Sequence, residues 1–300
     1  MRYVLSLIAA AAKAPLTRGD LKDARAALDA AGGRFAQPVW LAPETACEMP
    51  FEGKPDETLA GVRAVLSDRP IDVNVLPASG RRKLLLVADM DSTMIEQECI
   101  DELAAEIGER DRVAAITERA MRGEIAFEPA LRERVALLRD LPVEVAERVL
   151  ATRITLMPGA RTLIATMGAN GAHTVLVSGG FTLFTGKIAE RLGFREHRAN
   201  TLVSNAGRLT GEVAEPVLGR DAKEQALSDL TTRCRLRPEA TLAVGDGAND
   251  LGMIIRAGLG VAYRAKPALR ARAAAAIDHA DLTALLFLQG YRSEEFVAPA

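Results

Sequence analysis

Residues Lys83 to Thr93 read K-L-L-L-V-A-D-M-D-S-T, an apolar run that stops at two aspartates, Asp89 and Asp91. The run from Leu84 to Ala88 lacks polar alternation, which is typical of a strand buried on both faces of a parallel sheet. A buried helical segment is the alternative, but the run is short for a helix. In an open α/β sheet, ligands bind beyond the carboxyl ends of the strands. The stretch therefore predicts a strand that delivers Asp89 to a ligand site.

Helices and strands alternate in the second half of the chain. Strands are predicted at residues 173–177, 241–244 and 259–263, helices at 161–167, 182–192, 222–232 and 249–257, and a β-hairpin at 200–213. The alanine-rich tract from Ala271 to Ala276 predicts one more helix. Alternation of this kind implies an α/β fold with a doubly wound parallel sheet over residues 81–300.

Four predicted helices separate the first of these strands from the next one. They cover residues 95–107, 110–121, 128–138 and 143–153. A crossover between parallel strands needs only about a dozen residues. We therefore predict an inserted helical cap at about residues 95–155, positioned to cover a site at the end of the first strand.

Residues 1–80 are predicted to form a separate small α+β domain. Strands are expected at 3–9, twice within 36–51, and at 71–76, with helices at 21–31, capped by Asp20, and at 55–66. This β-α-β-β-α-β order is that of a ferredoxin-like domain and resembles the ACT-type amino-acid-binding domains in element order alone. A structural unit, or one that forms a homodimer, is the alternative.

Composition excludes several classes of protein. A net charge of -2 and 4% aromatic residues provide neither a basic face nor a base-stacking platform, so no nucleic-acid partner is expected. Cys47, Cys99 and Cys234 are far apart and suit unpaired thiols in a reducing cytoplasm. No apolar run reaches about 18 residues, so no membrane span is expected. Residues 2–12 also resemble a signal-peptide core, but a single arginine favours a strand.

Polar groups follow three of the predicted strands. They are Asp89 and Asp91, the triplet Ser178-Gly179-Gly180, and Asp246 with Asn249 and Asp250. A lone D-x-D pair usually begins a turn or caps a helix, but three such strand ends meet at one edge of a parallel sheet. The two glycines let the backbone approach an anion closely. Ser178 is predicted to donate to a phosphate, because Leu176 stands where a G-x-S-x-G nucleophile elbow needs glycine.

Lys223 adds a cation to this edge. Asp221 and Glu224 fit a capping box, which puts Lys223 in the first turn of a helix. A cation opposes the helix dipole there, and a bound anion would offset that repulsion. The alternative is a solvated surface lysine. A bound phosphate, however, would explain why a cation stands in the first turn of this helix.

The carboxylates need a further cation if they face a phosphate. Like charges about 4 Å apart repel by roughly 4 kcal/mol at an effective dielectric constant near 20. Magnesium prefers oxygen ligands and commonly binds carboxylates together with substrate phosphate. We therefore predict a Mg²⁺ site with Asp89 and Asp246 as ligands, helped by the backbone carbonyl of Asp91 and by Asp250.

The four ordered motifs resemble those of the haloacid dehalogenase (HAD) superfamily: D-M-D-S-T at Asp89, V-S-G-G-F at Ser178, Lys223 at a helix start, and G-D-G-A-N-D at Asp246. The D-x-D-S-T wording and the helical cap are similar to the phosphoserine phosphatases. The resemblance implies magnesium-dependent hydrolysis of O-phosphoserine, the last step of serine biosynthesis. It makes Asp89 the nucleophile that forms an aspartyl-phosphate and Asp91 the acid/base, whose pKa must be raised.

The same resemblance implies which residues contact the substrate. Glu98 in I-E-Q-E-C would bind its ammonium group and Arg134 in F-E-P-A-L-R-E-R-V its carboxylate, with Met121 and Phe127 as an apolar wall. Phosphate contacts would come from Ser178, Gly179, Gly180, Lys223 and Asn249. Without the resemblance, a solvated helix face or packing inside the cap explains the four cap residues equally simply.

Two other functions stay open at this point. A HAD phosphotransferase, or a phosphatase for another small phosphometabolite, would use the same core with a different cap specificity. A non-catalytic amino-acid sensor would make residues 1–80 the functional part, although the intact set of Asp89, Asp91, Lys223 and Asp246 argues against it.

Overall fold

Strand β6 (Leu85–Ala88) lies inside a six-stranded parallel sheet, as its unbroken apolar run predicts. The computed structural model describes residues 1–10, 14–121, 124–219 and 221–298. The strand order is β13-β12-β11-β6-β7-β8, and every adjacent pair is parallel. The other strands are β7 (His173–Phe181), β8 (Glu196–Asn200), β11 (Thr241–Gly245), β12 (Leu259–Tyr263) and β13 (Ala275–Ile277).

Alternate residues of β6 face two different helical layers. Leu85 and Val87 share an apolar cluster with α9 (Ala222–Arg233) and α10 (Leu251–Arg256). Leu86 and Ala88 belong to the cluster that contains α7 (Ala160–Ala169) and α8 (Thr182–Leu192). The doubly wound α/β fold is thus confirmed. Its connectivity brings the carboxyl ends of β6, β7 and β11 together, since these three strands are neighbours.

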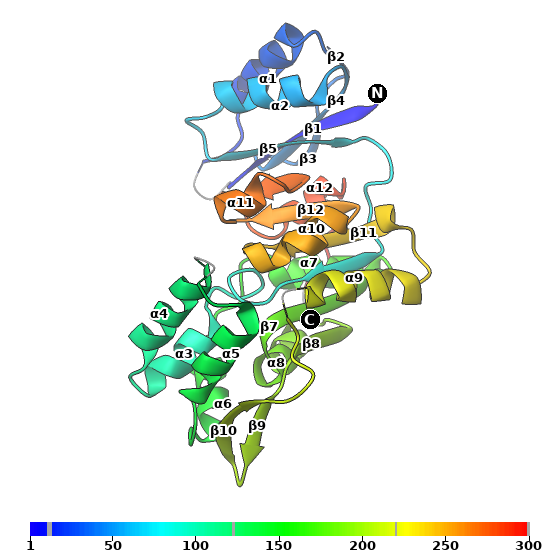
Figure 1. Ribbon diagram of the computed structural model, residues 1–300. Helices are drawn as coiled ribbons and strands as arrows, with labels where there is room; N and C mark the ends of the chain where they lie inside the picture. Colours follow the sequence, from blue (N-terminus) through cyan, green and yellow to red (C-terminus); the bar gives the residue numbers. More distant parts are fainter. Residues whose placement is uncertain (11–13, 122–123, 220, 299–300) are drawn as a thin grey trace.

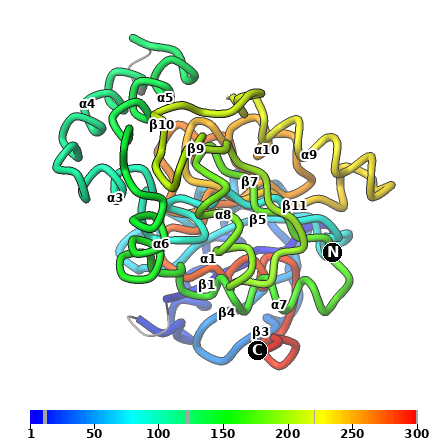
Figure 2. The backbone as a smooth tube through the Cα atoms, turned by 90° about the horizontal axis from the view of Figure 1, so that it is seen from below, coloured from blue at the N-terminus to red at the C-terminus, as the bar shows by residue number. Residues whose placement is uncertain are grey.

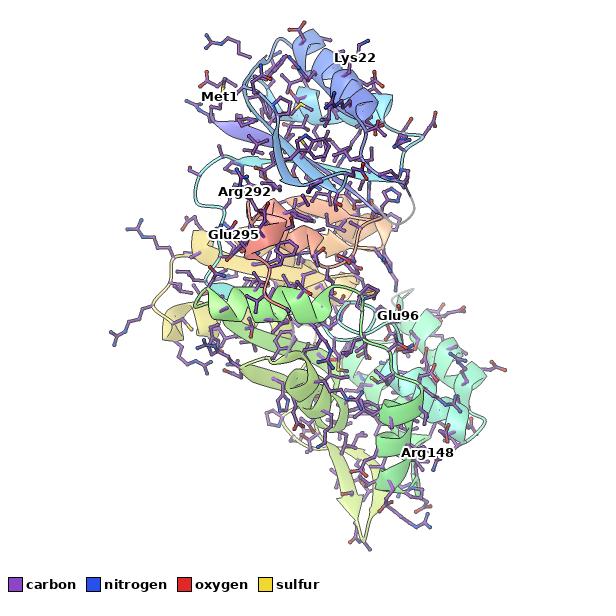
Figure 3. The ribbon with its side chains drawn as sticks, turned by 180° about the vertical axis from the view of Figure 1, so that it is seen from behind. Met1, Lys22, Glu96, Arg148, Arg292 and Glu295 are labelled. Atoms are coloured by element: carbon purple, nitrogen blue, oxygen red, sulfur yellow. The ribbon has the colours of Figure 1, made fainter. Side chains whose placement is uncertain are left out.

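The predicted cap is inserted between β6 and β7. It consists of α3 (Cys99–Glu106), α4 (Arg110–Met121), α5 (Phe127–Ala136) and α6 (Val143–Thr152), which lie to one side of the core when the molecule is seen from below (Figure 2). The two connections to the core run side by side, because the Glu96 N–H donates to the Thr155 carbonyl and the Met157 N–H to the Met94 carbonyl. Figure 3 shows Glu96 at this junction and Arg148 out on the cap.

Two local predictions were wrong. The first cap helix begins at Cys99 rather than at residue 95, because Ile95 instead forms an isolated bridge with Leu156. The tract from Ala271 to Ala276 is not a helix: α11 (Pro267–Arg270) ends before it, and Ala275 and Ala276 pair with β12. Strand pairing at the sheet edge overrides the helix propensity of alanine there.

Helix caps also differ from the predictions. Thr17, not Asp20, caps α1 (Arg18–Ala30), and Asp20 is the acidic partner of that capping box. In α9, Asp221 makes no side-chain capping bond. Glu224 instead pairs with Arg256 of α10. Lys223 nevertheless lies in the first turn, as predicted.

The hairpin predicted at 200–213 is β9 (Leu202–Asn205) with β10 (Arg208–Val213), and it packs beside the cap. Sequence reasoning missed β8, which comes just before it and forms one edge of the large sheet. Within the described residues no helix has both the length and the apolarity to cross a membrane. The three cysteines are unpaired.

The N-terminal unit, defined here as residues 1–80, has its own antiparallel sheet and lies at the opposite end of the molecule from the cap (Figure 1). Its sheet order is β2-β4-β1-β5, with β3 paired to β4. The elements are β1 (Tyr3–Ala9), α1, β2 (Arg34–Phe35), β3 (Val39–Ala42), β4 (Ala46–Glu52), α2 (Pro55–Val65) and β5 (Ile71–Pro77). A small α+β unit is therefore confirmed, with one more short strand than expected. Its likeness to ACT-type domains stays a prediction.

Side chains of β5 attach this unit to strand β13 at the edge of the large sheet. The Asn74 amide donates to the Ala276 carbonyl at 3.0 Å and accepts from the Ala276 N–H at 2.9 Å. The Asp72 carboxylate accepts the backbone N–H groups of residues 278–280. Arg81 donates to Glu48 and to the carbonyls of Phe287 and Leu288. The two sheets are thus joined by buried polar contacts.

Candidate active site

Asp89 follows directly after β6 and is buried against Lys223. The Lys223 Nζ lies 2.6 Å from Asp89 Oδ1 and 2.6 Å from Asp250 Oδ1. Burial alone would lower the pKa of Lys223, but the charges of Asp250 and Asp89 outweigh it and raise that pKa. The lysine is therefore a fixed cation between two carboxylates, held by the first turn of α9.

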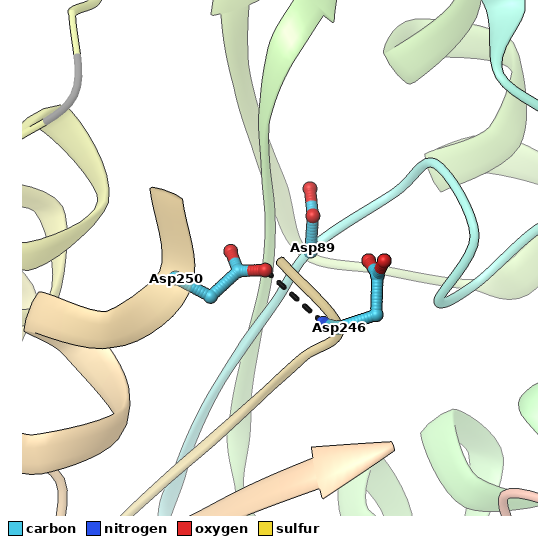
Figure 4. Close-up of side chains that lie close together, drawn as sticks. All are labelled: Asp89, Asp246 and Asp250. Atoms are coloured by element: carbon cyan, nitrogen blue, oxygen red, sulfur yellow. Dashed lines mark hydrogen bonds between the residues drawn. The ribbon is translucent and has the colours of Figure 1, made fainter. Parts of the chain in front are cut away.

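One lysine does not neutralise the acids at this edge. Asp89, Asp246 and Asp250 each offer one carboxylate oxygen, and these three oxygens lie within 4.8 Å of one another. Figure 4 shows the three side chains gathered at this point. Burial and the charge of Asp250 raise the pKa of Asp89 well above its usual range, despite the opposing effect of Lys223. Burial and Asp250 likewise raise the pKa of Asp246 to about 6. This uncompensated set of hard oxygen donors fits a divalent cation such as Mg²⁺.

The three carboxylates differ in how many of their oxygens are already used. Asp250 Oδ2 accepts the N–H groups of Asp246 and Gly247 at 3.1 and 3.0 Å, while its Oδ1 accepts from Lys223. Asp250 is therefore better placed to orient the loop and the lysine than to be a direct metal ligand. Asp246 Oδ1 accepts the Thr93 hydroxyl at 3.2 Å. Asp89 and Asp246 are the best candidates for direct ligands.

The Asp91 side chain lies outside this group of three and has its own partners. Its Oδ1 accepts the Cys99 N–H at 2.9 Å, at the start of α3, and its Oδ2 accepts the Ser178 hydroxyl at 3.2 Å. Burial raises the pKa of Asp91, against the hydrogen bond from Cys99. A raised pKa favours the protonated form, which is the form that a general acid needs. The predicted metal site used the backbone carbonyl of Asp91 and not its side chain.

The backbone at Gly180 packs closely against Asp91. A Cβ atom at Gly180 would lie 3.1 Å from both Asp91 Oδ2 and Ser178 Oγ. The Gly180 N–H donates to Ser178 Oγ at 2.8 Å, which fixes the hydroxyl at the end of β7. Gly179 gives similar room to Phe127, whose Cζ would lie 3.4 Å from an added Cβ.

A single pocket collects most of the residues predicted to bind phosphate. It is lined by the predicted Ser178, Gly179, Lys223, Asn249 and Phe127, together with Val177, Leu218, Gly219 and Ala222. Sequence reasoning missed Leu218 and Gly219, because neither has a charged or hydroxyl side chain; both lie in the loop before α9. Its position beside Lys223 was the only available signal.

The two charged cap residues, Glu98 and Arg134, lie close enough for their charges to interact. Glu98 precedes α3, and its carboxylate accepts the Ser92 hydroxyl at 2.7 Å. Burial of the carboxylate and the charge of Asp91 raise the pKa of Glu98 to about 7. Burial lowers the pKa of Arg134, while Asp101 and Glu98 act in the opposite direction. The side chain of Met121 lies outside the described part of the structure.

The guanidinium of Arg134 is only weakly held by the cap itself. It donates to the Ala130 carbonyl of its own helix at 3.2 Å and to the Thr117 hydroxyl at 3.3 Å. Sequence reasoning missed Thr117 and Asp101, since a threonine and an acid on amphipathic helices give no distinguishing signal. Glu98 and Arg134 thus offer opposite charges on the cap, although neither lines the pocket around Ser178 and Lys223.

The fold and these motifs define a class of hydrolase. The chain belongs to the haloacid dehalogenase-like hydrolase family, whose sequence profile matches residues 86–254. Among its relatives is a phosphoserine phosphatase of Archaeoglobus fulgidus, 45% identical over 217 residues, which are 72% of this chain and 63% of the relative. The chain spans 58–63% of the length of this and two further phosphoserine phosphatases that it matches.

Two solved structures extend the likeness to three dimensions. A probable phosphoserine phosphatase from Vibrio cholerae, in unliganded form, superposes with a TM-score of 0.79 and 30% identity, covering 98% of this chain and 88% of that one. A phospho-aspartyl intermediate analogue of phosphoserine phosphatase superposes with a TM-score of 0.64 and 42% identity, covering 69% of this chain and 98% of that one. The superposition on the Vibrio cholerae structure includes the N-terminal unit.

Proposed function

We propose that this protein is a magnesium-dependent phosphatase that releases serine from O-phosphoserine through an aspartyl-phosphate at Asp89. The observation that carries the proposal is the pairing of two differently held acids: Asp89 buried on Lys223, and Asp91 bonded to Ser178 and to the first turn of the cap. The names of the relatives support this substrate. A cytoplasmic location is also proposed, from the three unpaired cysteines.

The first chemical step forms the intermediate. A carboxylate oxygen of Asp89 attacks phosphorus, the bond between phosphorus and the serine oxygen breaks, and Asp91 gives its proton to that oxygen. Asp91 needs to be protonated at this point, and its burial favours that state. Lys223 keeps Asp89 oriented and supplies positive charge for the phosphoryl oxygens.

The second step returns the enzyme to its starting state. Asp91, now ionised, takes a proton from a water molecule, and the resulting hydroxide attacks the aspartyl-phosphate. The bond between Asp89 and phosphorus breaks, which releases phosphate and regenerates the Asp89 carboxylate. Because one acid serves both as donor and as acceptor, it must reach the leaving oxygen and the attacking water on the same side of phosphorus.

The phosphate-binding groups would be the Ser178 hydroxyl, the backbone of Gly179 and Gly180, Lys223 and Asn249. Magnesium would be held by Asp89, Asp246 and the Asp91 carbonyl with Asp250 in support, and when bound it supplies positive charge to the phosphoryl group. The proposed assignment of Asp250 is indirect, because its oxygens already accept the backbone N–H groups of Asp246 and Gly247 and the Lys223 ammonium.

The cap would select the substrate. Glu98 offers a carboxylate for the ammonium group, and Arg134 offers a guanidinium for the carboxylate of phosphoserine. Phe127, which lines the pocket, would form the apolar wall together with Met121. A phosphotransferase, or a phosphatase for another metabolite, would share the core but not this pair of charges.

Phosphate release from a panel of phosphomonoesters tests the proposal. We expect O-phospho-L-serine to be the best substrate, activity to vanish in EDTA, and Mg²⁺ to restore it. Asp89→Asn should abolish turnover, while Asp111→Asn, an exposed cap residue, should not change it. No phosphate release from phosphoserine with magnesium would refute the assignment, and transfer to added alcohols at the rate of hydrolysis would favour the phosphotransferase.

A further inference from the structure

A second pocket lies between the N-terminal unit and the edge of the large sheet. It has a volume of about 160 Å³ and shares no lining residue with the pocket around Ser178 and Lys223. Its charged lining comes from both sides of the junction: Arg63, Arg69 and Asp72 from the N-terminal unit, and Arg270, Asp278 and His279 from the large domain. Nothing in the proposed phosphatase chemistry uses it.

The arginines of this pocket have hydrogen-bond donors to spare. A guanidinium carries five N–H donors. Arg63 uses Nε and one terminal nitrogen on the Val73 carbonyl, at 3.2 and 3.0 Å, and Arg270 uses Nε on Asp278 at 2.7 Å. Arg69 uses one terminal nitrogen on the Pro15 carbonyl and the Asp20 carboxylate, at 2.9 and 3.0 Å, but its Nε is buried and has no hydrogen-bond partner among the described residues. Buried donors without a partner are rare and costly, which indicates that a ligand or ordered water completes the site.

Among the residues that line the pocket, positive charge is in excess. Three guanidinium groups stand against two carboxylates there, and Asp72 already accepts three backbone N–H groups across the junction. Arg69 is also paired with Asp20, which does not line the pocket, so Arg63 and Arg270 carry most of this excess. Burial and the positive charge of Arg270 lower the pKa of Arg63, so these two groups are close enough to repel each other. An oxyanion between them would remove this repulsion and accept several charge-assisted hydrogen bonds at once.

We propose that Arg63, Arg69 and Arg270 form a binding site for a small oxyanion, either phosphate or a carboxylate-bearing metabolite, at the junction of the N-terminal unit with the large domain. The ligand bridges the two sides, because Arg63 and Arg69 belong to one and Arg270 to the other. Its binding therefore stabilises the attachment of the N-terminal unit, and this stabilisation grows with the logarithm of the ligand concentration above the dissociation constant. The inference does not depend on the proposed phosphatase activity.

Isothermal titration of the full-length, metal-free protein with inorganic phosphate and, separately, with succinate tests the site. We expect saturable binding of at least one probe at millimolar concentration, weakened about tenfold or more in Arg270→Gln by the loss of charge-assisted hydrogen bonds. Arg272→Gln, an exposed arginine of the same segment, is the matched control and should bind as the unchanged protein does. Which probe binds identifies the chemical source of the oxyanion.

A second variant protects the test against a folding defect. Asp278→Asn removes a competing acid and releases Arg270 Nε, so it should tighten binding severalfold, which an unfolded variant cannot do. Thermal unfolding of each variant checks that it is folded. The proposal is overturned if neither probe binds, or if binding is the same in the unchanged protein, Arg270→Gln and Asp278→Asn.

Discussion

Glu98 is a single residue whose ionisation should be visible in the kinetics. Its pKa is raised to about 7, so the carboxylate that would bind the substrate ammonium is protonated at lower pH. We expect the KM for phosphoserine to rise as the pH falls through this value. Glu98→Gln should raise KM by about 10- to 100-fold at pH 8, the loss expected for a hydrogen bond between charged groups.

The substrate phosphate titrates as well, and Glu98→Gln controls for it. The ratio of the KM of the variant to that of the unchanged protein should shrink as the pH falls below about 7. If that ratio is independent of pH, Glu98 does not bind the ammonium group.

Arg134 should determine selectivity for a carboxylate. Arg134→Lys keeps the charge but loses the planar fork that binds a carboxylate through two hydrogen bonds. We expect a KM about tenfold higher for phosphoserine and little change for phosphoethanolamine, which lacks the carboxylate. Arg132→Lys, two residues away on the same helix and paired with Glu128 and Glu215, is the matched control. Equal losses on both substrates would assign Arg134 a structural role.

At the scale of elements, the end of β11 is fitted tightly to the loop that follows it. A Cβ atom at Gly245 would lie 2.3 Å from Asp250 Cγ, and Asp250 is the partner of Lys223. Gly245→Ala should therefore destabilise the fold by about 1–3 kcal/mol, as overpacking does, and lower activity by displacing that lysine. Urea unfolding and phosphate release measure the two effects.

A helical glycine provides the control for this substitution. Gly168 in α7 has open space around an added Cβ, so Gly168→Ala should leave activity unchanged and stabilise by about 0.5–1 kcal/mol. If Gly245→Ala behaves like Gly168→Ala, the packing of the Asp250 loop is not needed for catalysis.

Elements buried on both faces were predictable, and those decided by distant contacts were not. The run before Asp89 predicted β6 because only a central strand buries every residue, and the same logic placed β7, β11 and β12. Alanines at 275 and 276 favour a helix locally, but β12 offers them a pairing partner that lies outside any local window. The motif residues were predictable because strand ends meet at one edge, whereas Leu218 and Gly219 reach the pocket through a loop whose path only the fold determines.

At the scale of the whole molecule, one asparagine makes two of the buried hydrogen bonds that join the two sheets. Asn74 is 1% exposed, and Asn74→Ala would leave the N–H and the carbonyl of Ala276 without partners. We expect a loss of about 2–4 kcal/mol in the free energy of unfolding, the cost of two buried unpaired groups. Asn205→Ala, at an exposed position in the β9-β10 hairpin, should cost no more than about 0.5 kcal/mol.

Chemical denaturation followed by fluorescence of Trp40 in β3 would report the N-terminal unit, while phosphate release reports the large domain. A similar loss in both variants would show that the Asn74 contact contributes nothing specific.

The division of the chain at residue 80 and a homodimer through the N-terminal unit remain predictions, and light scattering of the full chain decides the second.

The position of Asn74 also bears on the exposed edge of the large sheet. Strand β13 ends the large sheet, and an open sheet edge is a template on which a second chain can add a strand. The asparagine amide imitates a neighbouring backbone at one residue, so it occupies the edge without continuing the sheet. A fragment that begins after residue 80 would expose this template, and we expect it to self-associate through β13 even if its catalytic pocket forms correctly.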